Sequence, residues 1–250
     1  MPHYIKVSQT ASTNTYLSRL AATLPGGTVI YTPSQTAGRG QRGNSWESED
    51  GKNLTFSLLL KRPPVKARDQ FCLSEAAALA VVEALTAEAG ESFTVKWPND
   101  VYWQDKKICG MLIENSLDGS HIATCIVGIG INVNQQHFVS DAPNPVSLTN
   151  ITGREHDLDA LLKRVCSRIE QLVAALGDDE ARRDLHRRYM TALYRNDGAM
   201  HPYEDAAGHR FMATVADIAP DGTLTLRHED GTEVSYLFKE VRHIINNTVL

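Results

Sequence analysis

A polar loop at residues 33–53 carries the clearest chemistry in this sequence. Its central run, GRGQRG, combines three glycines with two arginines: Gly38, Arg39, Gly40, Arg42 and Gly43. Glycines let backbone N–H groups approach an anion, and guanidinium groups are permanent planar cations suited to phosphate oxygens. The loop therefore predicts an anion site, in which Trp46 either stacks on a purine or packs the loop down. The alternative is a solvated, flexible loop with a structural tryptophan.

The same run fits the pattern G-x-G-x-x-G, but its surroundings exclude a dinucleotide-binding fold. A dinucleotide fingerprint needs a helix directly after the glycines, whereas the turn-rich NSWESEDGKN follows here and a strand comes next. The partner motifs of protein kinases and the P-loop lysine are also missing from the sequence. The loop must therefore bind its anion in another framework.

A second group of polar residues follows the strand that ends in KWPNDVYW. Pro98 ends the strand and forces the residue before it to be extended. Lys96, Asn99 and Asp100 then gather at a strand terminus, where polar groups are often functional. The competing interpretation is an Asn-Asp turn beside a surface lysine.

Two further segments combine strand character with glycines. DKKICG places Lys106 and Lys107 before a strand that contains Gly110, and GIGINVN places two glycines in an apolar strand that ends in asparagines. A glycine inside a strand marks a bulge or a close approach of another group, and a ligand lying across the sheet accounts for it. A bulge with two exposed lysines explains DKKICG equally well.

Other chemistries have little support. Nine histidines are scattered without a zinc-binding spacing, and the four cysteines (Cys72, Cys109, Cys125 and Cys166) form no CxxC pair, which predicts free thiols in a reducing compartment. The N-terminus has no basic-then-apolar signal, and the longest apolar stretch, at 122–131, is too short to cross a bilayer. These features predict a cytoplasmic protein without a membrane span.

Alternating and helical patterns predict the elements that must position these residues. Strands are expected in the following segments: 4–8, 28–32, 54–61, 92–97, 106–117 and 121–134, the last two forming a hairpin across DGS. Helices are expected at 11–24, 69–90, 157–176 and 178–193. Beyond residue 194 the sequence reads as short strands joined by two Asp-Gly turns.

The length and charge limit the architecture. A chain of 250 residues makes one large domain or one domain plus a small one, and we expect a large domain at 1–194 and a small β-domain at 195–250. The net charge is −5, which gives no support to DNA binding, although it leaves room for a small DNA module.

Taken together and in order, the segments STN (12–14), QTAGRGQRGNSW (35–46), KWPNDVYWQDKKICGMLIE (96–114) and GIGINVN (128–134) resemble biotin–protein ligases. The resemblance covers nearly the whole chain. It implies an α+β fold, with a mixed β-sheet backed by helices, distantly similar to class II aminoacyl-tRNA synthetases, and a small C-terminal SH3-like barrel. The start of STN at residue 12 implies the form without an N-terminal DNA-binding domain.

The resemblance also implies a two-step reaction. Biotin and ATP give biotinyl-5′-AMP and pyrophosphate, with Mg²⁺ carried mainly by ATP, and a lysine of a biotin carboxyl carrier protein then displaces AMP. In the first step two anions meet, so cations and N–H donors must face the developing charge. Arg39, Arg42 and Lys107 are the catalytic candidates.

The site residues carried over from the family fall into two groups. The biotin group comprises Ser12, Thr13, Asn14, Gln35, Arg39, Gly40, Gln41, Lys107 and Gly110. The ATP group comprises Gly38, Arg39, Arg42, Asn44, Trp46, Lys107 and Asn132. Within the first group, Ser12, Thr13 and Gln35 would bond the ureido ring, and Gly110 would leave room for the biotin tail.

One departure from the family pattern concerns the charge of the loop. Many relatives have arginines where this chain has Gln41 and Asn44, and the arginine at the first position helps to retain the adenylate. Either Arg42 supplies that charge, or the intermediate is held less tightly.

Three alternatives remain: a lipoate or octanoate ligase of the same superfamily, a biotin-sensing repressor, and a non-catalytic biotin-binding module. Monomers and homodimers both occur among the relatives, and the residues do not separate the two states.

Overall fold

The computed structural model describes residues 2–41, 45–139 and 144–245. Its larger part is a seven-stranded sheet with the order β1-β2-β3-β7-β6-β5-β4. The strands are β1 (His3–Lys6), β2 (Thr28–Thr32), β3 (Leu54–Lys61), β4 (Thr94–Lys96), β5 (Asp100–Trp103), β6 (Lys106–Asp118) and β7 (His121–Ile131). β1 and β2 pair in parallel and the other neighbours pair antiparallel, so the sheet is mixed, as predicted.

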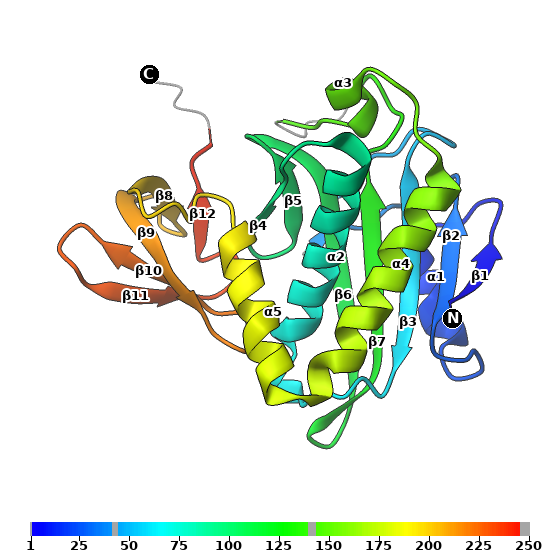
Figure 1. Ribbon diagram of the computed structural model, residues 1–250, viewed down its shortest axis with the longest axis horizontal. Coiled ribbons are helices and arrows are strands. Elements are labelled where there is room, and N and C mark those ends of the chain that lie inside the picture. Colours follow the sequence, from blue (N-terminus) through cyan, green and yellow to red (C-terminus); the bar gives the residue numbers. More distant parts are fainter. Residues whose placement is uncertain (1, 42–44, 140–143, 246–250) are drawn as a thin grey trace.

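The helices of this part lie on both faces of the sheet. They are α1 (Thr13–Leu20), α2 (Phe71–Ala89), α3 (Leu148–Thr152), α4 (Leu158–Ala174) and α5 (Asp179–Ala192), with short 3₁₀ turns at η2 (Ala67–Asp69) and η3 (Ala175–Gly177). α2 and α4 cover one face (Figure 1), where Leu58 and Val127 are buried in the main core. α1 packs on the other face, where Leu17 contacts Ile30 and Leu59.

Side chains alternate between the two faces of the sheet along each strand, which determines the residues on the second face, the one that α1 covers. Leu59 meets α1, so Ser57 of β3 lies on the same face. By the same alternation, Gly128 and Gly130 of β7 lie on the same face as Ile126. Glu114 of β6, which pairs with Ile126, lies on this face as well. The second face is therefore rich in glycine and polar groups, which suits a binding surface better than a core.

The C-terminal part is a five-stranded antiparallel sheet with the order β11-β10-β9-β8-β12. Its strands are β8 (His201–Asp205), β9 (Arg210–Ile218), β10 (Leu224–His228), β11 (Glu233–Tyr236) and β12 (Val241–His243). Gly222 and Gly231, in the two Asp-Gly turns, have φ values of 95° and 83°, which glycine adopts without strain. The predicted mixed sheet backed by helices, followed by a β-rich region, is confirmed.

Two elements differ from the sequence-based expectation. β5 follows directly after the cis Trp97–Pro98 peptide and forms a hairpin with β4, although the segment reads as a turn. α3 lies in a segment, between 134 and 157, for which no helix or strand was predicted, and it begins with a capping box formed by Ser147 and Asn150. Both elements are too short, at four and five residues, to produce a periodic signal.

The region Ala67–Ala89 is long and apolar enough to cross a membrane by length and composition alone. However, 67% of its apolar window is buried inside the structure, which is the pattern of a core helix. All four cysteines are free and buried, as the sequence predicted for thiols. Burial raises the pKa of Cys72 and Cys125 to about 12, so these thiols are poor nucleophiles.

His186 of α5 connects α2 to the C-terminal sheet. Its Nδ1 lies 2.7 Å from Oε1 of the buried Glu75 of α2, and its Nε2 lies 3.1 Å from Oδ1 of Asp217 of β9. The hydrogen bond with Glu75 raises the pKa of His186 to about 9, against the opposing effect of burial. The imidazolium therefore links α2 to the C-terminal sheet at neutral pH.

This link predicts a pH-dependent stability. Because the pKa is higher in the folded state than the ordinary value of about 6.5, the contribution is complete below pH 6.5 and declines as pH rises through about 9. The melting temperature of His186→Gln should therefore lie below that of the wild type at pH 6, and the gap should narrow by pH 9.5. The exposed His3→Gln serves as the control, and a gap that does not change with pH would contradict the assignment.

Candidate functional site

A cavity of about 800 Å³ lies on the second face of the large sheet, where the C-terminal sheet closes one side. Its floor is formed by the glycine-bearing parts of β6 and β7. Its walls are the start of α1, the loop that follows β2, the turn between β4 and β5, and residues of β8 and β12. Ten of the predicted site residues line it: Ser12, Thr13, Asn14, Gln35, Arg39, Gly40, Gln41, Trp46, Lys107 and Gly110.

The end of the cavity beside α1 is polar and buried. Ser12 occupies the N-cap position of α1 but makes no side-chain cap bond, so its hydroxyl is not used by the helix. The Thr13 backbone N–H donates to Oε1 of Gln35 at 2.8 Å, which turns the Gln35 amide nitrogen away from Thr13. We call Ser12, Thr13, Asn14 and Gln35 the polar end. Its hydroxyl and amide groups can pair with a ligand that offers both N–H and C=O.

A hydrogen-bonded network continues from the polar end to the glycine-rich loop. Asn14 Nδ2 donates to Oε2 of Glu114 at 2.7 Å. Arg39 Nη2 lies 3.1 Å from both oxygens of the same carboxylate. The Arg39–Glu114 pair is almost half exposed, so it holds Arg39 only weakly and leaves its guanidinium available to another anion.

Trp46 packs against the floor where glycines make room for it. A Cβ at Gly130 would come within 2.4 Å of the indole, and one at Gly110 would come within 3.1 Å. Gly38 is required for a different reason, because a Cβ there would meet the Trp46 carbonyl oxygen at 2.6 Å. The close approach that was predicted at Gly110 is thus made by the Trp46 side chain.

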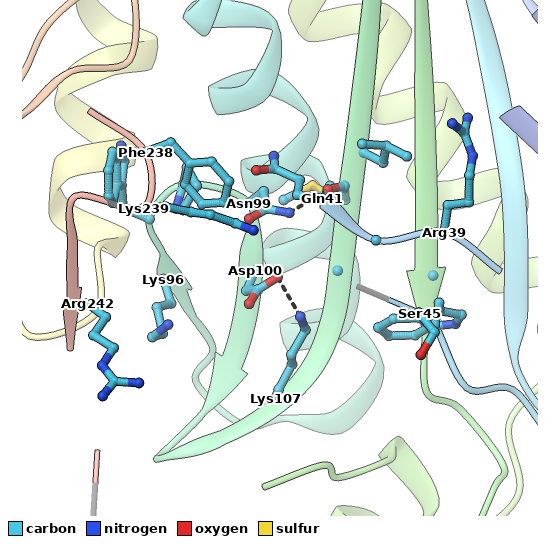
Figure 2. A pocket seen from close by; sticks show the side chains of 18 of the residues that line it. Arg39, Gln41, Ser45, Lys96, Asn99, Asp100, Lys107, Phe238, Lys239 and Arg242 are labelled. Atoms are coloured by element: carbon cyan, nitrogen blue, oxygen red, sulfur yellow. Dashed lines mark hydrogen bonds and ion pairs between the residues drawn. The ribbon is translucent and has the colours of Figure 1, made fainter. Parts of the chain in front are cut away.

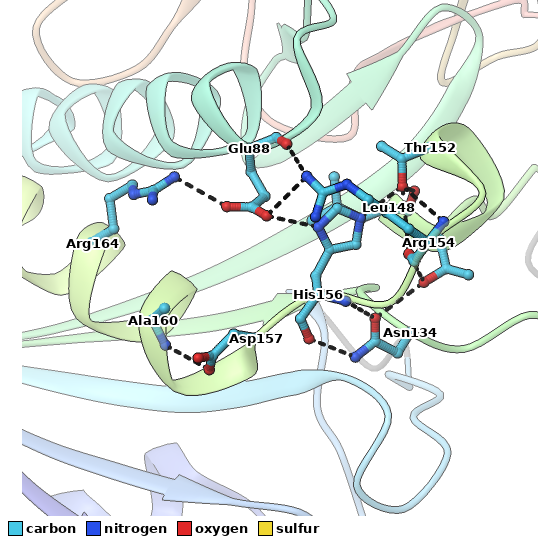
Figure 3. A network of polar contacts seen from close by, with 10 residues as sticks. Glu88, Asn134, Leu148, Thr152, Arg154, His156, Asp157, Ala160 and Arg164 are labelled. Carbon is cyan, nitrogen blue, oxygen red and sulfur yellow. Dashed lines mark hydrogen bonds and ion pairs between the residues drawn. The ribbon is translucent and has the colours of Figure 1, made fainter.

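Lys107 reaches into the middle of the cavity and pairs with Asp100, with Nζ 2.8 Å from Oδ1 (Figure 2). Its Nζ also lies 5.9 Å from the centre of the Trp46 ring. Lys96 stands on the far side of Asp100, over the ring of Tyr102. Burial lowers the pKa of Lys96, Asp100 opposes this effect, and Lys107 adds to it. The KWPND and DKKICG segments therefore form one charged cluster.

The C-terminal part supplies a wall that sequence reasoning did not find. Phe238, Lys239 and Arg242 line the cavity on the side of Lys96 (Figure 2). Arg242 Nε donates to Oε1 of Glu204 at 3.1 Å. Burial, and then the nearby cation Lys96, hold the pKa of His243 well below its usual range, so its ring lines the cavity in the neutral form. No motif identifies these residues, because only the packing of the two sheets brings them to the site.

The remaining predicted residues lie elsewhere. Asn132 is buried just beyond the end of β7 and does not line the cavity; its Nδ2 donates to the Val146 carbonyl at 3.2 Å and its Oδ1 has no partner among the described residues. Gly38 does not line the cavity. Arg42 and Asn44 lie outside the described residues.

In the part of the chain that the structure covers, no group of three or more His, Cys, Asp and Glu residues could hold a metal ion.

Comparison with known proteins identifies the framework. Residues 7–132 match the model of the biotin/lipoate A/B protein ligase family. The chain belongs to this family. The cavity residues from α1 to β7 fall inside the matched region, so this family's core carries the polar end, the glycine-rich loop and the charged cluster.

Relatives of this chain differ in length. The bifunctional ligase/repressor BirA of Bacillus spizizenii is 36% identical over 146 residues, which cover 56% of this chain and 44% of that protein. The biotin–[acetyl-CoA-carboxylase] ligase of Paracoccus denitrificans is 35% identical over 162 residues, covering 62% of this chain and 67% of that protein. The chain thus spans less than half the length of the Bacillus relative that it matches.

A solved structure extends the likeness to the C-terminal sheet. The biotin protein ligase from Aquifex aeolicus, in complex with biotin and ATP, superimposes with a TM-score of 0.79 and 27% identity. The match covers 98% of this chain and 100% of that chain. The resemblance noted from the sequence motifs is confirmed, and it includes the second sheet that closes the cavity.

Proposed function

We propose that this chain is a cytoplasmic biotin–protein ligase that activates biotin with ATP and transfers it to one lysine of a carrier protein. Residues 1–194 would form the catalytic domain and residues 195–250 the domain that closes the cavity. The Aquifex aeolicus structure contains both biotin and ATP, and its chain matches this one over nearly the full length.

The polar end is the observation that carries the choice of biotin. A ureido ring offers two N–H donors beside one carbonyl acceptor, which Ser12, Thr13 and Gln35 can pair with. The dithiolane of lipoate and the alkyl chain of octanoate have no such groups. They would leave buried hydroxyl and amide groups unpaired, which disfavours binding by roughly 1–3 kcal/mol per group.

The charged residues suit the first step. An oxygen of the biotin carboxylate attacks the α-phosphorus of ATP, and the bond to the β-phosphate oxygen breaks to release pyrophosphate. Lys107 lies within the cavity between the floor and Asp100, where its ammonium can face both the carboxylate and the α-phosphate. Arg39 would bind the carboxylate from the side of the loop, and Arg42 would add charge there.

The adenine of ATP would lie on the side of the cavity that holds Trp46, and its triphosphate would extend past Lys107 toward the C-terminal sheet. Lys96 and Arg242 lie on the opposite side of Lys107 from Arg39 (Figure 2). These two cations would pair with oxygens of the triphosphate. The unpaired Oδ1 of Asn132 supports a role on the adenine side. The Mg²⁺ bound to ATP would neutralise part of the triphosphate charge.

The second step needs an amine and a protected intermediate. The carrier lysine loses a proton, its nitrogen attacks the acyl carbon of biotinyl-5′-AMP, and AMP leaves as the amide forms. The Trp46 side chain packs on the floor, and over a bound intermediate it would limit the access of water to the mixed anhydride. The Paracoccus denitrificans relative is named for acetyl-CoA carboxylase, which supports a carboxylase carrier domain as the partner.

Exchange of pyrophosphate into ATP tests the proposed substrate. We expect exchange that depends on biotin and is absent with lipoate or octanoate as the only acid. Exchange with lipoate in place of biotin would support the rival ligase. Biotin binding without exchange would indicate a non-catalytic module, and retention of DNA by the biotin- and ATP-loaded protein in a gel shift would indicate a repressor.

A substitution at Gly130 should disturb the site through Trp46. In Gly130→Ala the new methyl group would overlap the indole, so Trp46 must leave the floor and the loop must shift with it. We expect kcat/KM for exchange to fall about 10- to 100-fold, as a misplaced loop weakens positioning. Gly26→Ala is the control, because its nearest contact would be an ordinary 3.4 Å. Equal activity of both variants would show that Trp46 does not need the floor.

A further inference from the structure

The hydroxyl of Ser57 lies behind the polar end and has two oxygen neighbours. Its Oγ is 2.6 Å from Oδ1 of Asn14 and 2.7 Å from Oγ1 of Thr13. Ser57 is completely buried in β3. A hydroxyl has one proton, so it can donate to only one of these two oxygens, and it must accept from the other.

The orientation of the Asn14 amide decides which one. Asn14 Nδ2 lies 3.1 Å from the Leu112 carbonyl oxygen and 2.7 Å from a carboxylate oxygen of Glu114. Both neighbours accept hydrogen bonds, so the amide nitrogen must face them and Oδ1 must face Ser57. Gly128 permits this position, because a Cβ there would lie 2.1 Å from Asn14 Oδ1. An amide oxygen can only accept, so Ser57 donates its proton to Asn14.

The polarity of the cavity surface follows from this step. The Thr13 hydroxyl has two possible acceptors, Ser57 Oγ at 2.7 Å and Gln35 Oε1 at 3.3 Å. With the Ser57 proton committed to Asn14, the shorter contact needs the proton of Thr13. The Thr13 hydroxyl therefore turns its lone pairs, and not its proton, toward the cavity. The Gln35 oxygen accepts from the Thr13 N–H, which leaves the Gln35 amide nitrogen as a donor.

We infer that Ser57, Asn14 and Glu114 are positioning residues that fix Thr13 as a hydrogen-bond acceptor, so that the site selects a ring N–H over a ring oxygen. This inference rests on the proposed function and names the ureido N–H as the group that Thr13 recognises. Asn14, whose amide is fully engaged with the protein, acts through Thr13 and does not itself bond the ligand. Residues that do not bond the ligand thus set the hydrogen-bonding specificity of Thr13.

The test compares biotin with its two carbamate analogues, in each of which one ureido N–H is replaced by a ring oxygen of similar size. Dissociation constants are measured by calorimetry for the wild type and for Ser57→Ala. The wild type should bind biotin on the order of 100-fold more tightly than the analogue with oxygen facing Thr13. In Ser57→Ala the Thr13 proton loses its short acceptor and can be donated to a ligand ring oxygen or, at 3.3 Å, to Gln35 Oε1, so this preference should fall below about tenfold.

Two further variants separate polarity from structure. Thr55→Val removes another buried hydroxyl of β3, which donates to the Thr32 carbonyl, and should keep the full preference. Thr13→Val removes the acceptor itself, so it should weaken biotin binding while leaving the analogue nearly unchanged. If Ser57→Ala does not fold, Thr13→Val provides the test.

The outcomes distinguish the inference from the proposed function. Ser57→Ala weakening biotin and the analogue by the same factor, or a wild type that binds all three ligands equally, overturns the inference while biotin binding stands. A wild type that binds no biotin overturns the proposed function and the inference together.

Discussion

Replacing Lys107 by alanine is expected to reduce biotin-dependent exchange of pyrophosphate into ATP by at least about 10³-fold, the scale seen when a preorganised charge stabiliser is removed. Lys107 Nζ is held by Asp100 at 2.8 Å inside the cavity, so its charge is already in place before two anionic substrates meet. Without it, Asp100 would face the carboxylate and the α-phosphate with no neutralising partner nearby on β6. The loss should therefore appear in kcat as well as in kcat/KM.

Lys106→Ala is the matched control for this prediction. Lys106 is the neighbouring residue on β6, but its side chain is exposed and does not line the cavity. Its removal should leave exchange within about twofold of the wild type, as is usual for exposed positions. Normal exchange in Lys107→Ala would remove Lys107 from the reaction and would sink the proposed mechanism.

Replacing Arg39 by alanine is expected to raise the apparent KM for biotin about 10- to 100-fold, the range for a charged hydrogen bond. Arg39 pairs with both oxygens of Glu114, and this half-exposed pair is easily exchanged for a ligand carboxylate. In the variant the Glu114 carboxylate is left without its partner, so it also repels the biotin carboxylate. The effect on kcat should be smaller than the effect on KM.

Arg62→Ala provides the comparison, because Arg62 also forms an exposed ion pair, with Asp118 at 3.3 Å, but lies outside the cavity. It should leave the KM for biotin unchanged. If Arg39→Ala also leaves the KM unchanged, Arg39 does not contact biotin.

Sequence patterns were sufficient to predict the strands that form the floor of the site. The alternation in 106–117 and 121–134 predicted the hairpin that became the floor, and glycines in those strands predicted a close approach. What approaches was not predictable: Trp46 packs on Gly130, and the Asn14 amide packs on Gly128. A glycine signals that space is required, but the group that fills the space depends on the tertiary fold.

The residues behind and beside the site were harder to predict for physical reasons. Ser57 is the one polar residue in the otherwise apolar run that follows Thr55 in β3. This anomaly was the only available signal of its role. Glu114 reads as an ordinary polar strand residue. Phe238 and Arg242 come from a sheet that meets the cavity only through domain packing, which no local pattern encodes.

Mass spectrometry of a carrier domain tests the central claim most directly. The carrier domain of a biotin-dependent carboxylase is incubated with this protein, biotin and MgATP, and the intact mass and the modified residue are determined. The proposal predicts the gain of one biotinyl group on one lysine, absent without ATP and absent in Lys107→Ala. A carrier that stays unmodified with biotin, or that gains a lipoyl or octanoyl group instead, would contradict it.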